Sequence, residues 1–248
     1  GIEKTEGTFI VAAGISAVLG LLSFALPNTP PKAAGTPSSM GAILGKDAFV
    51  LLKNKSFLVF FISAIAICIP LSFYYGFANP FLNEVGLDNV AGKMTMGQMS
   101  EAIFILAIPF LFNKIGVKNM LIFGIAAWVL RYVCFAYGNM DASWMLYAGI
   151  ILHGICYDFF FVTGYMYTEK KAGENIKNAA QGLFTFATYG VGMFIGTNYS
   201  GFVVEQNKLA DATGHNWQSI WLTPAAIAGA VLIAFILFFK EKKEVAAA

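Results

Sequence analysis

Charged side chains are scarce in this 248-residue sequence. They make up 12% of the residues, and hydrophobic residues make up 58%, whereas a soluble domain averages about 25% charged residues. The apolar residues fall in long blocks without the alternation of period two that marks a membrane barrel. Because only helices satisfy their own backbone hydrogen bonds within lipid, the composition predicts an all-α integral membrane protein. The net charge of +2 gives no reason to expect a nucleic-acid partner.

Groups suited to metal, disulfide or enzyme chemistry are also few. The cysteines Cys68, Cys134 and Cys156 are odd in number, lie within apolar blocks and lack metal-ligand spacing. We therefore predict them to be small core residues. The two histidines are far apart, and no nucleophile–base pair or phosphate-binding loop is visible. These absences predict a protein that is not an enzyme and carries no cofactor.

Seven apolar blocks approach or exceed the roughly 20 residues that one bilayer crossing needs. They lie at residues 7–26, 57–82, 94–112, 117–137, 143–168, 176–204 and 217–239. A stretch rich in Pro, Gly, Ser and Lys separates the first block from the other six. We predict a transmembrane helix in residues 1–26, a linker at 27–56, a six-helix bundle at 57–240 and a tail at 241–248. Because the chain begins at Gly1 and lacks a signal-peptide cleavage pattern, we expect it to be the later part of a longer polypeptide.

The basic residues indicate the topology, because cytoplasmic loops are enriched in Lys and Arg. Twelve of the 16 basic residues fall in every second loop: Lys32, Lys46, Lys53, Lys55, Lys114, Lys118, Lys170, Lys171, Lys177, Lys240, Lys242 and Lys243. This bias predicts that the linker and the C-terminus are cytoplasmic. Trp144, Trp217 and Trp221 open blocks at the opposite side, where we expect an interfacial aromatic belt.

Gln98 and Glu101 are the first candidates for a functional site. They are three residues apart and therefore share one face of a helix. Glu101 lies about 10 Å into its apolar block at about 1.5 Å per residue. A carboxylate at that depth is costly and marks a functional site unless it is paired. The alternative is a structural role, with Glu101 bound to Arg131, the single arginine.

A second group lies in the block at 143–168. His153 and Tyr157 are four residues apart and share a helix face, and Asp158 follows about 100° further round. We expect His153 and Tyr157 to line a cavity and Asp158 to titrate or bind a polar group. The alternatives are a tether between helices for Asp158 and ordinary packing for the aromatic rings.

Three segments together resemble the nucleoside:proton symporter family of the major facilitator superfamily. They are QMSE at 98–101, YDFF at 157–160 and AQGLF at 180–184, and the basic turn FLFNKIGVKN at 110–119 resembles that superfamily's cytoplasmic turns. The resemblance implies half of a twelve-helix fold, with seven transmembrane helices in this chain. It makes residues 1–26 the last helix of an N-terminal half that is otherwise missing, and 57–240 the C-terminal half.

The resemblance also implies the site. In that family the residues matching Gln98 and Glu101 contact the nucleoside, the residue matching Asp158 is functional, and the aromatic at Tyr157 lines the pocket. A tyrosine occupies the place of His153. In the block at 57–82, a Gln and an Asn of some members align with Ser72 and Tyr75, which we include as candidate substrate contacts.

The expected function is nucleoside uptake across a bacterial inner membrane, driven by proton entry through alternating access. Glu101 and Asp158 are the candidate proton carriers, and the partners are a nucleoside, a proton, the lipid bilayer and the N-terminal half. Another major facilitator permease or exporter, for a sugar or a drug, is the alternative. A seven-helix receptor is a more distant one, because no lysine lies in the interior of a block, where it could hold a retinal.

Overall fold

The computed structural model describes residues 5–29, 45–210 and 214–240. The chain divides into two compact units, Gly1–Met40 and Gly41–Ala248, and the division falls inside the predicted linker. Lys4, the linker residues 30–44 with Lys32, and the tail 241–248 with Lys242 and Lys243 lie outside the described residues. The first unit contains helix α1 (Gly7–Ser23), which has 17 residues and buries none of them within the unit.

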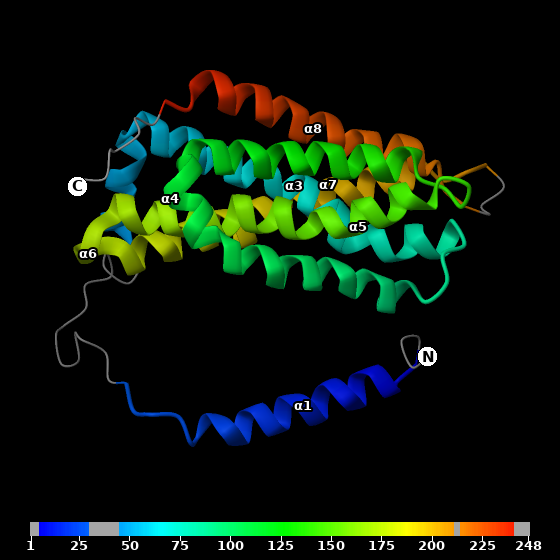
Figure 1. Ribbon diagram of the computed structural model, residues 1–248, viewed down its shortest axis with the longest axis horizontal. Helices are drawn as coiled ribbons and strands as arrows, with labels where there is room; N and C mark the ends of the chain where they lie inside the picture. The colour runs from blue at the N-terminus through cyan, green and yellow to red at the C-terminus, as the bar shows by residue number, and fades with distance from the viewer. Residues whose placement is uncertain (1–4, 30–44, 211–213, 241–248) are drawn as a thin grey trace. The chain divides into compact units, whose positions relative to one another are not determined.

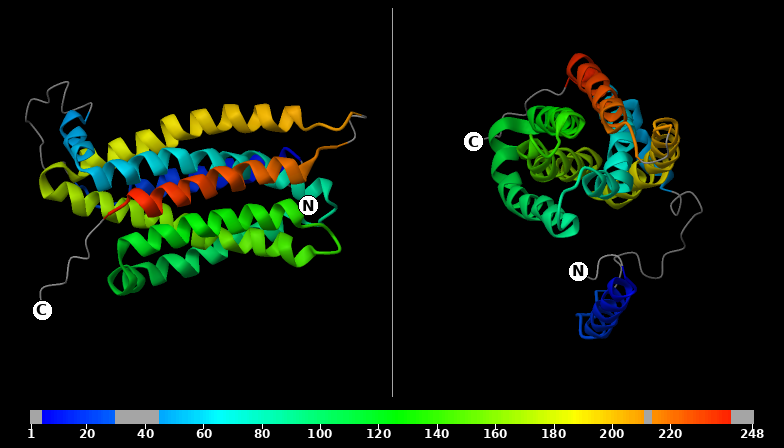
Figure 2. Two further views of the ribbon diagram at one scale, coloured as in Figure 1. Left: turned by 90° about the horizontal axis from the view of Figure 1, so that it is seen from above. Right: turned by 90° about the vertical axis from the view of Figure 1, so that its right-hand side faces the viewer.

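The second unit is a bundle of long helices seen end-on in Figure 2. Its elements are η1 (Lys46–Lys53), α3 (Lys55–Glu84), α4 (Val90–Tyr137), α5 (Ser143–Tyr157), η2 (Asp158–Val162), α6 (Thr163–Thr185), η3 (Phe186–Gly192), α7 (Met193–Gln206) and α8 (Trp217–Phe238). The long helices are α-helical, η1 is a 3₁₀-helix, and η2 and η3 are π-helical turns. Within the described residues the structure therefore confirms the all-α prediction.

The number of separate helices differs from the prediction. Four continuous helical runs of the described residues are long and apolar enough to cross a membrane: 55–84, 90–137, 143–206 and 217–238. The sequence predicted seven helices, because it indicated separate helices in two pairs of neighbouring blocks. These pairs are 94–112 with 117–137 and 143–168 with 176–204. The structure joins each pair through one glycine with positive φ, Gly116 (φ 77°) and Gly173 (φ 67°). A side chain at either position is disfavoured in this backbone conformation.

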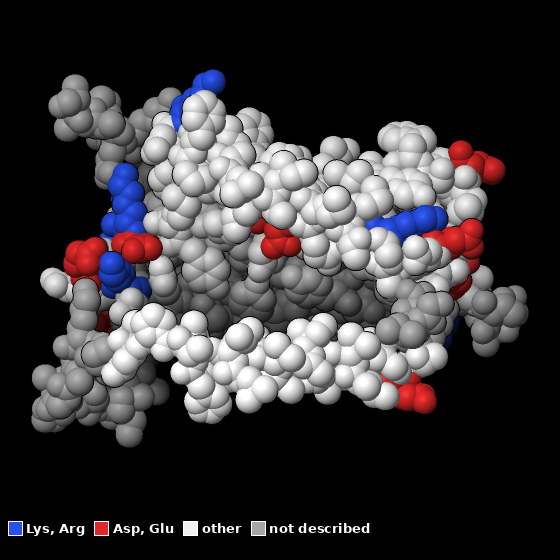
Figure 3. Space-filling view, turned by 60° about the horizontal axis from the view of Figure 1, so that its bottom comes forward, with Lys and Arg blue, Asp and Glu red and all other residues white. Residues whose placement is uncertain are grey.

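The chain turns back at Gly116, so that the two arms of α4 run antiparallel (Figure 1). The turns at Gly116 and Gly173, the 3₁₀-helix η1 and the end of α8 all lie at one end of the bundle. The described lysines of the predicted cytoplasmic side lie in or next to these segments. Charged side chains concentrate toward the two ends of the bundle in Figure 3. The middle of the bundle is thus left largely apolar, as a lipid environment requires.

Part of the predicted linker is folded. Residues 46–53 form η1, which buries Ala48 and Leu51. Its N-cap Gly45 lies against Ala179 of α6. Asn54 then caps α3, with its side-chain oxygen accepting a hydrogen bond from the Phe57 N–H at 3.0 Å. The polar composition of the linker concealed this element, because only two of its 8 residues are buried.

The core is aromatic at the end where α8 begins. Trp221 is fully buried, and its ring packs against Tyr132, Phe135 and Phe81, with centroid distances of 5.1 to 5.7 Å. Trp217 is buried beside it. These two residues, which we expected in an interfacial aromatic belt, therefore pack into the interior of the bundle at this end. Trp144 is 67% exposed, as a belt residue should be. The three cysteines are buried and free, which confirms their structural reading.

Candidate functional site

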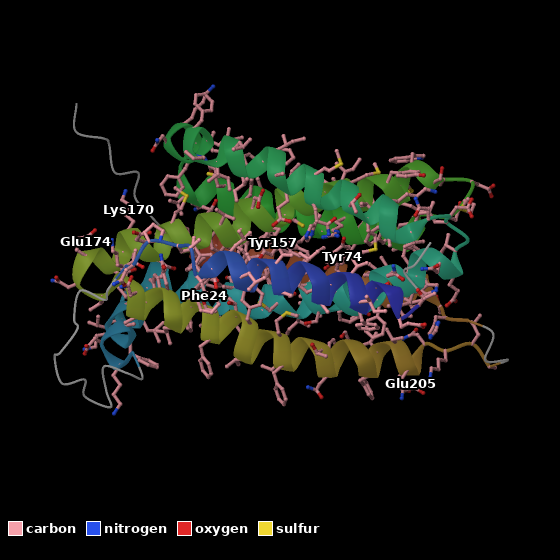
Figure 4. The ribbon with its side chains drawn as sticks, turned by 90° about the horizontal axis from the view of Figure 1, so that it is seen from below. Phe24, Tyr74, Tyr157, Lys170, Glu174 and Glu205 are labelled. Carbon is pink, nitrogen blue, oxygen red and sulfur yellow. The ribbon has the colours of Figure 1, made fainter. Side chains whose placement is uncertain are left out.

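A buried arginine lies at the centre of the candidate site. Arg131 on the second arm of α4 has no exposed surface, and its guanidinium carbon lies 3.4 Å from the centre of the Tyr74 ring. Its Nη1 lies 2.8 Å from Nδ1 of His153 on α5. Figure 4 shows Tyr74 and Tyr157 midway along the bundle, with Lys170 and Glu174 near one end and Glu205 near the other. The site is therefore remote from both ends of the helices.

His153 connects this arginine to Glu101. The imidazole is buried, stacks on the Tyr74 ring at a centroid distance of 5.0 Å, and places Nε2 3.8 Å from Oε2 of Glu101. Among the described residues no carboxylate forms an ion pair with Arg131. The direct Glu101–Arg131 pair considered from the sequence is thus replaced by a chain in which His153 is the middle member.

Close helix packing holds Glu101 in place. The preceding residue, Ser100, donates a hydrogen bond from Oγ to the Ile151 carbonyl of α5 at 2.7 Å. A Cβ added to Gly154 of α5 would come within 2.6 Å of the Glu101 backbone nitrogen. The Glu101 side chain itself remains 31% exposed. Figure 3 shows acidic side-chain atoms midway along the bundle, between the charged groups toward its two ends.

We expect Gly154→Ala to destabilise the bundle by about 1–3 kcal/mol, because overpacking a tight core forces the backbone to shift. The added methyl group would separate α5 from the first arm of α4 and displace Glu101 from His153. Gly182→Ala is the matched control, since nothing lies within 4 Å of a Cβ added there. Thermal unfolding of the purified protein measures both changes. Equal melting temperatures for the two variants would contradict the packing argument.

Tyr157 extends the site toward η3. Its ring lies 5.6 Å from that of His153 and 5.2 Å from that of Phe161, and its hydroxyl is hydrogen-bonded to the hydroxyl of Tyr189. Tyr75 is 51% exposed and lies within electrostatic range of both Glu101 and Tyr189. These partly exposed aromatic rings offer flat apolar surfaces beside a carboxylate.

Asp158 begins the π-helical turn η2 and has no exposed surface. Neither of its carboxylate oxygens has a hydrogen-bond partner among the described residues, although Glu101 lies within electrostatic range. Gly124 of α4 allows the backbone of this turn to approach closely, because a Cβ there would lie 2.9 Å from the Phe160 nitrogen. π-Helical turns inside longer helices occur frequently at functional sites. Among the described residues, Asp158 therefore has no side-chain hydrogen bond that would support the alternative of a tether to a neighbouring helix.

The remaining predicted site residues, Gln98 and Ser72, lie in surroundings different from those of Glu101 and Asp158. Gln98 is exposed on the first arm of α4. Ser72 is buried against α7, where its hydroxyl donates to the Cys68 carbonyl at 2.9 Å and lies 3.4 Å from the Met193 sulfur. Its contacts do not support a role in binding substrate. The described residues contain no group of three or more His, Cys, Asp or Glu side chains that could hold a metal ion.

The sequence did not single out Tyr74 and Tyr189. Tyr74 is one of several aromatic residues in its block, and the family resemblance pointed to its neighbour Tyr75 instead. Tyr189 lies in η3, and the π-helical geometry of this turn alters helical spacing there. Tyrosine within an apolar helix was the one available signal for both residues.

Comparisons with known proteins identify relatives of this chain. A family model described as "Nucleoside H+ symporter" matches residues 1–244. The putative nucleoside transporter YegT of Escherichia coli is 40% identical over 97% of this chain. The nucleoside permease NupG and the xanthosine permease of the same organism are 34% and 32% identical over 98% and 97% of it. The chain spans 58–60% of the length of these relatives.

Solved structures of NupG are also similar. One matches with a TM-score of 0.75 at 34% identity, covering 94% of this chain and 60% of NupG. A mutant form matches with a TM-score of 0.82 at 32% identity, covering 96% and 62%. All of these relatives are transporters or permeases, in agreement with the prediction that the protein is not an enzyme. The chain belongs to the nucleoside:proton symporter family of membrane transporters.

Proposed function

We propose that the second unit crosses the bilayer six times and α1 once. A straight helix of the 48 residues of α4 would be about 72 Å long at 1.5 Å per residue, against a hydrocarbon core of about 30 Å. Each arm flanking Gly116 thus suffices for one crossing, and the run at 143–206 divides likewise at Gly173. This arrangement gathers the lysine-rich turns on one side, which we assign to the cytoplasm together with the linker and the C-terminus.

The six crossings then form the C-terminal half of a twelve-helix major facilitator transporter, and α1 is the last helix of the N-terminal half. The 58–60% coverage of the relatives supports this assignment. The rest of the N-terminal half would supply the opposite wall of the substrate site, as the paired repeats of such transporters do. The E. coli relatives support a bacterial inner membrane as the location.

The complete transporter imports a nucleoside together with a proton by alternating access. Glu101 and Gln98 suit hydrogen bonding to ribose hydroxyls, and the rings of Tyr157 and Tyr75 suit stacking on the base. His153 orients Glu101. Glu101 and Asp158 are the two groups able to carry the proton through an otherwise apolar region, the first beside the substrate and the second enclosed behind it.

A single observation carries this proposal: Oε2 of the partly exposed Glu101 lies 3.8 Å from Nε2 of buried His153. The His153 ring stacks on Tyr74, which lies midway along the apolar bundle. An ionisable group is costly at such a depth. The exposed part of Glu101 gives it access to substrate and proton, while His153 and Arg131 supply polar partners behind it.

Uptake by the full-length transporter in proteoliposomes tests the proposal. We expect radiolabelled nucleosides, tested as a panel of adenosine, uridine, inosine and xanthosine, to accumulate when the outside is more acidic. Dissipating the gradient with a protonophore should reduce uptake to equilibration. Nucleoside accumulation that is the same with and without the pH gradient would refute proton coupling. Calorimetric binding of a sugar in place of any nucleoside would favour the alternative permease.

A further inference from the structure

The role of Arg131 is not explained by the transport steps above. A charge buried without an ionic partner costs several kcal/mol unless other interactions compensate for it. Here the face of Tyr74 at 3.4 Å and His153 at 2.8 Å are its close partners, with the Cys156 sulfur 3.4 Å from Nη1. Nε and Nη2 have no hydrogen-bond partner among the described residues. Such a costly residue is retained more readily for function than for stability.

The contact with His153 determines where the imidazole carries its proton. A guanidinium group has donors and no acceptor, so the Arg131 N–H must donate to Nδ1. Nδ1 is then unprotonated, and a neutral imidazole carries its proton on Nε2. Nε2 is the nitrogen that faces Oε2 of Glu101 at 3.8 Å. Stacking on Tyr74 restricts the ring from turning away.

We propose that Arg131 is a positioning residue that fixes His153 as a hydrogen-bond donor to Glu101 and thereby promotes release of the Glu101 proton. The inference rests on the proposed function. An approach of about 1 Å would bring Nε2 within hydrogen-bond distance of the carboxylate. Charge-assisted hydrogen bonds to a carboxylate favour its ionised form. The proton leaves the Glu101 oxygen for cytoplasmic water, and His153 keeps its own.

The other titratable groups facing Glu101 do not provide this effect. Tyr75 comes from α3, Tyr157 from α5 and Asp158 from η2, and each lies within electrostatic range of Glu101. None of them is a cation, and a second carboxylate opposes ionisation of the first. Arg131, acting through His153, is therefore the group in this cluster that favours the charged carboxylate.

The test compares the pH dependence of uptake in the full-length transporter, with radiolabelled adenosine and uridine as probes. In Arg131→Gln, Glu101 should keep its proton at higher pH, so the external pH of half-maximal uptake should rise by about one unit, as when a nearby opposite charge is removed. His153→Phe retains the stacked ring without the Nε2 proton and should shift the midpoint in the same direction. Arg131→Lys keeps the charge and should shift it less. Lys208→Gln removes an outlying cation and serves as the control.

A rise of the midpoint in Arg131→Gln and His153→Phe, but not in the control, supports the inference. An unchanged midpoint in variants that still transport would overturn it, and so would equal shifts in Arg131→Lys and Arg131→Gln. If Arg131→Gln does not fold, His153→Phe decides. A wild-type transporter indifferent to the gradient refutes the proposed function and this inference together. If the gradient drives uptake by the wild type but the midpoint pH of the variants does not shift, only this inference is refuted.

Discussion

Glu101→Gln is expected to abolish gradient-driven accumulation of nucleosides by the full-length transporter. Glutamine keeps the size of the side chain and can still bond a ribose hydroxyl, but it cannot bind and release a proton. The variant should therefore let nucleoside equilibrate across the membrane without concentrating it. Uptake into proteoliposomes under an imposed pH gradient measures this, with the internal concentration at steady state as the readout.

Exchange of nucleoside across the membrane distinguishes coupling from binding. If Glu101 serves mainly as the proton carrier, Glu101→Gln should still exchange external for preloaded nucleoside, because exchange requires no net proton movement. Glu174→Gln is the matched control, since this exposed acid pairs with Lys177 at 3.1 Å near one end of the bundle. Wild-type accumulation by Glu101→Gln would remove Glu101 from the coupling mechanism. Loss of exchange as well would give it a role in binding.

The two acids could be found from the sequence because their cost in lipid depends on depth, and depth follows from position along an apolar block. The side chains that contact these acids could not be predicted from position along a block. Helical spacing related His153 to Tyr157, whereas the contacts of His153 with Glu101 and Arg131 join three helical segments. Such contacts depend on how the helices are rotated about their axes, which the nearly uniform apolarity of these segments does not specify.

The number of continuous helices differs from the prediction for a related reason. Hydropathy located the apolar segments but could not distinguish a loop from one glycine with positive φ, as at Gly116 and Gly173. The π-helical turns η2 and η3 could not be predicted from the sequence either. A π-turn holds one more residue than an α-turn, and no particular residue type marks it. Trp221 shows the same limitation: tryptophan suits both a membrane interface and an aromatic core, and the neighbours that decide between them lie on α3 and α4.

These differences affect the interpretation of Asp158 most. The sequence placed it one position after Tyr157, on a face pointing elsewhere. The structure encloses it in η2 with both oxygens unpartnered among the described residues, while Tyr157 stays partly exposed beside it. Neighbouring residues thus have separate environments, one suited to substrate and one to a proton alone. An unpaired polar group in such a position costs about 1–3 kcal/mol in proteins, and more when it is charged.

Asp158→Ala is therefore expected to stabilise the transporter while abolishing accumulation. Removing the unpartnered carboxyl should outweigh the small cavity left behind and raise the melting temperature by a few degrees. Asp158→Asn separates the two effects: it retains unpartnered polar atoms and should leave the melting temperature nearly unchanged, yet it cannot carry a proton and should also fail to accumulate nucleoside.

Asp141→Ala, at an exposed position, controls for loss of an acid. Thermal unfolding and gradient-driven uptake, measured on the same preparations, check both parts. A lower melting temperature in Asp158→Ala would show that Asp158 is a structural group, and accumulation by Asp158→Asn would show that its proton is not used in transport.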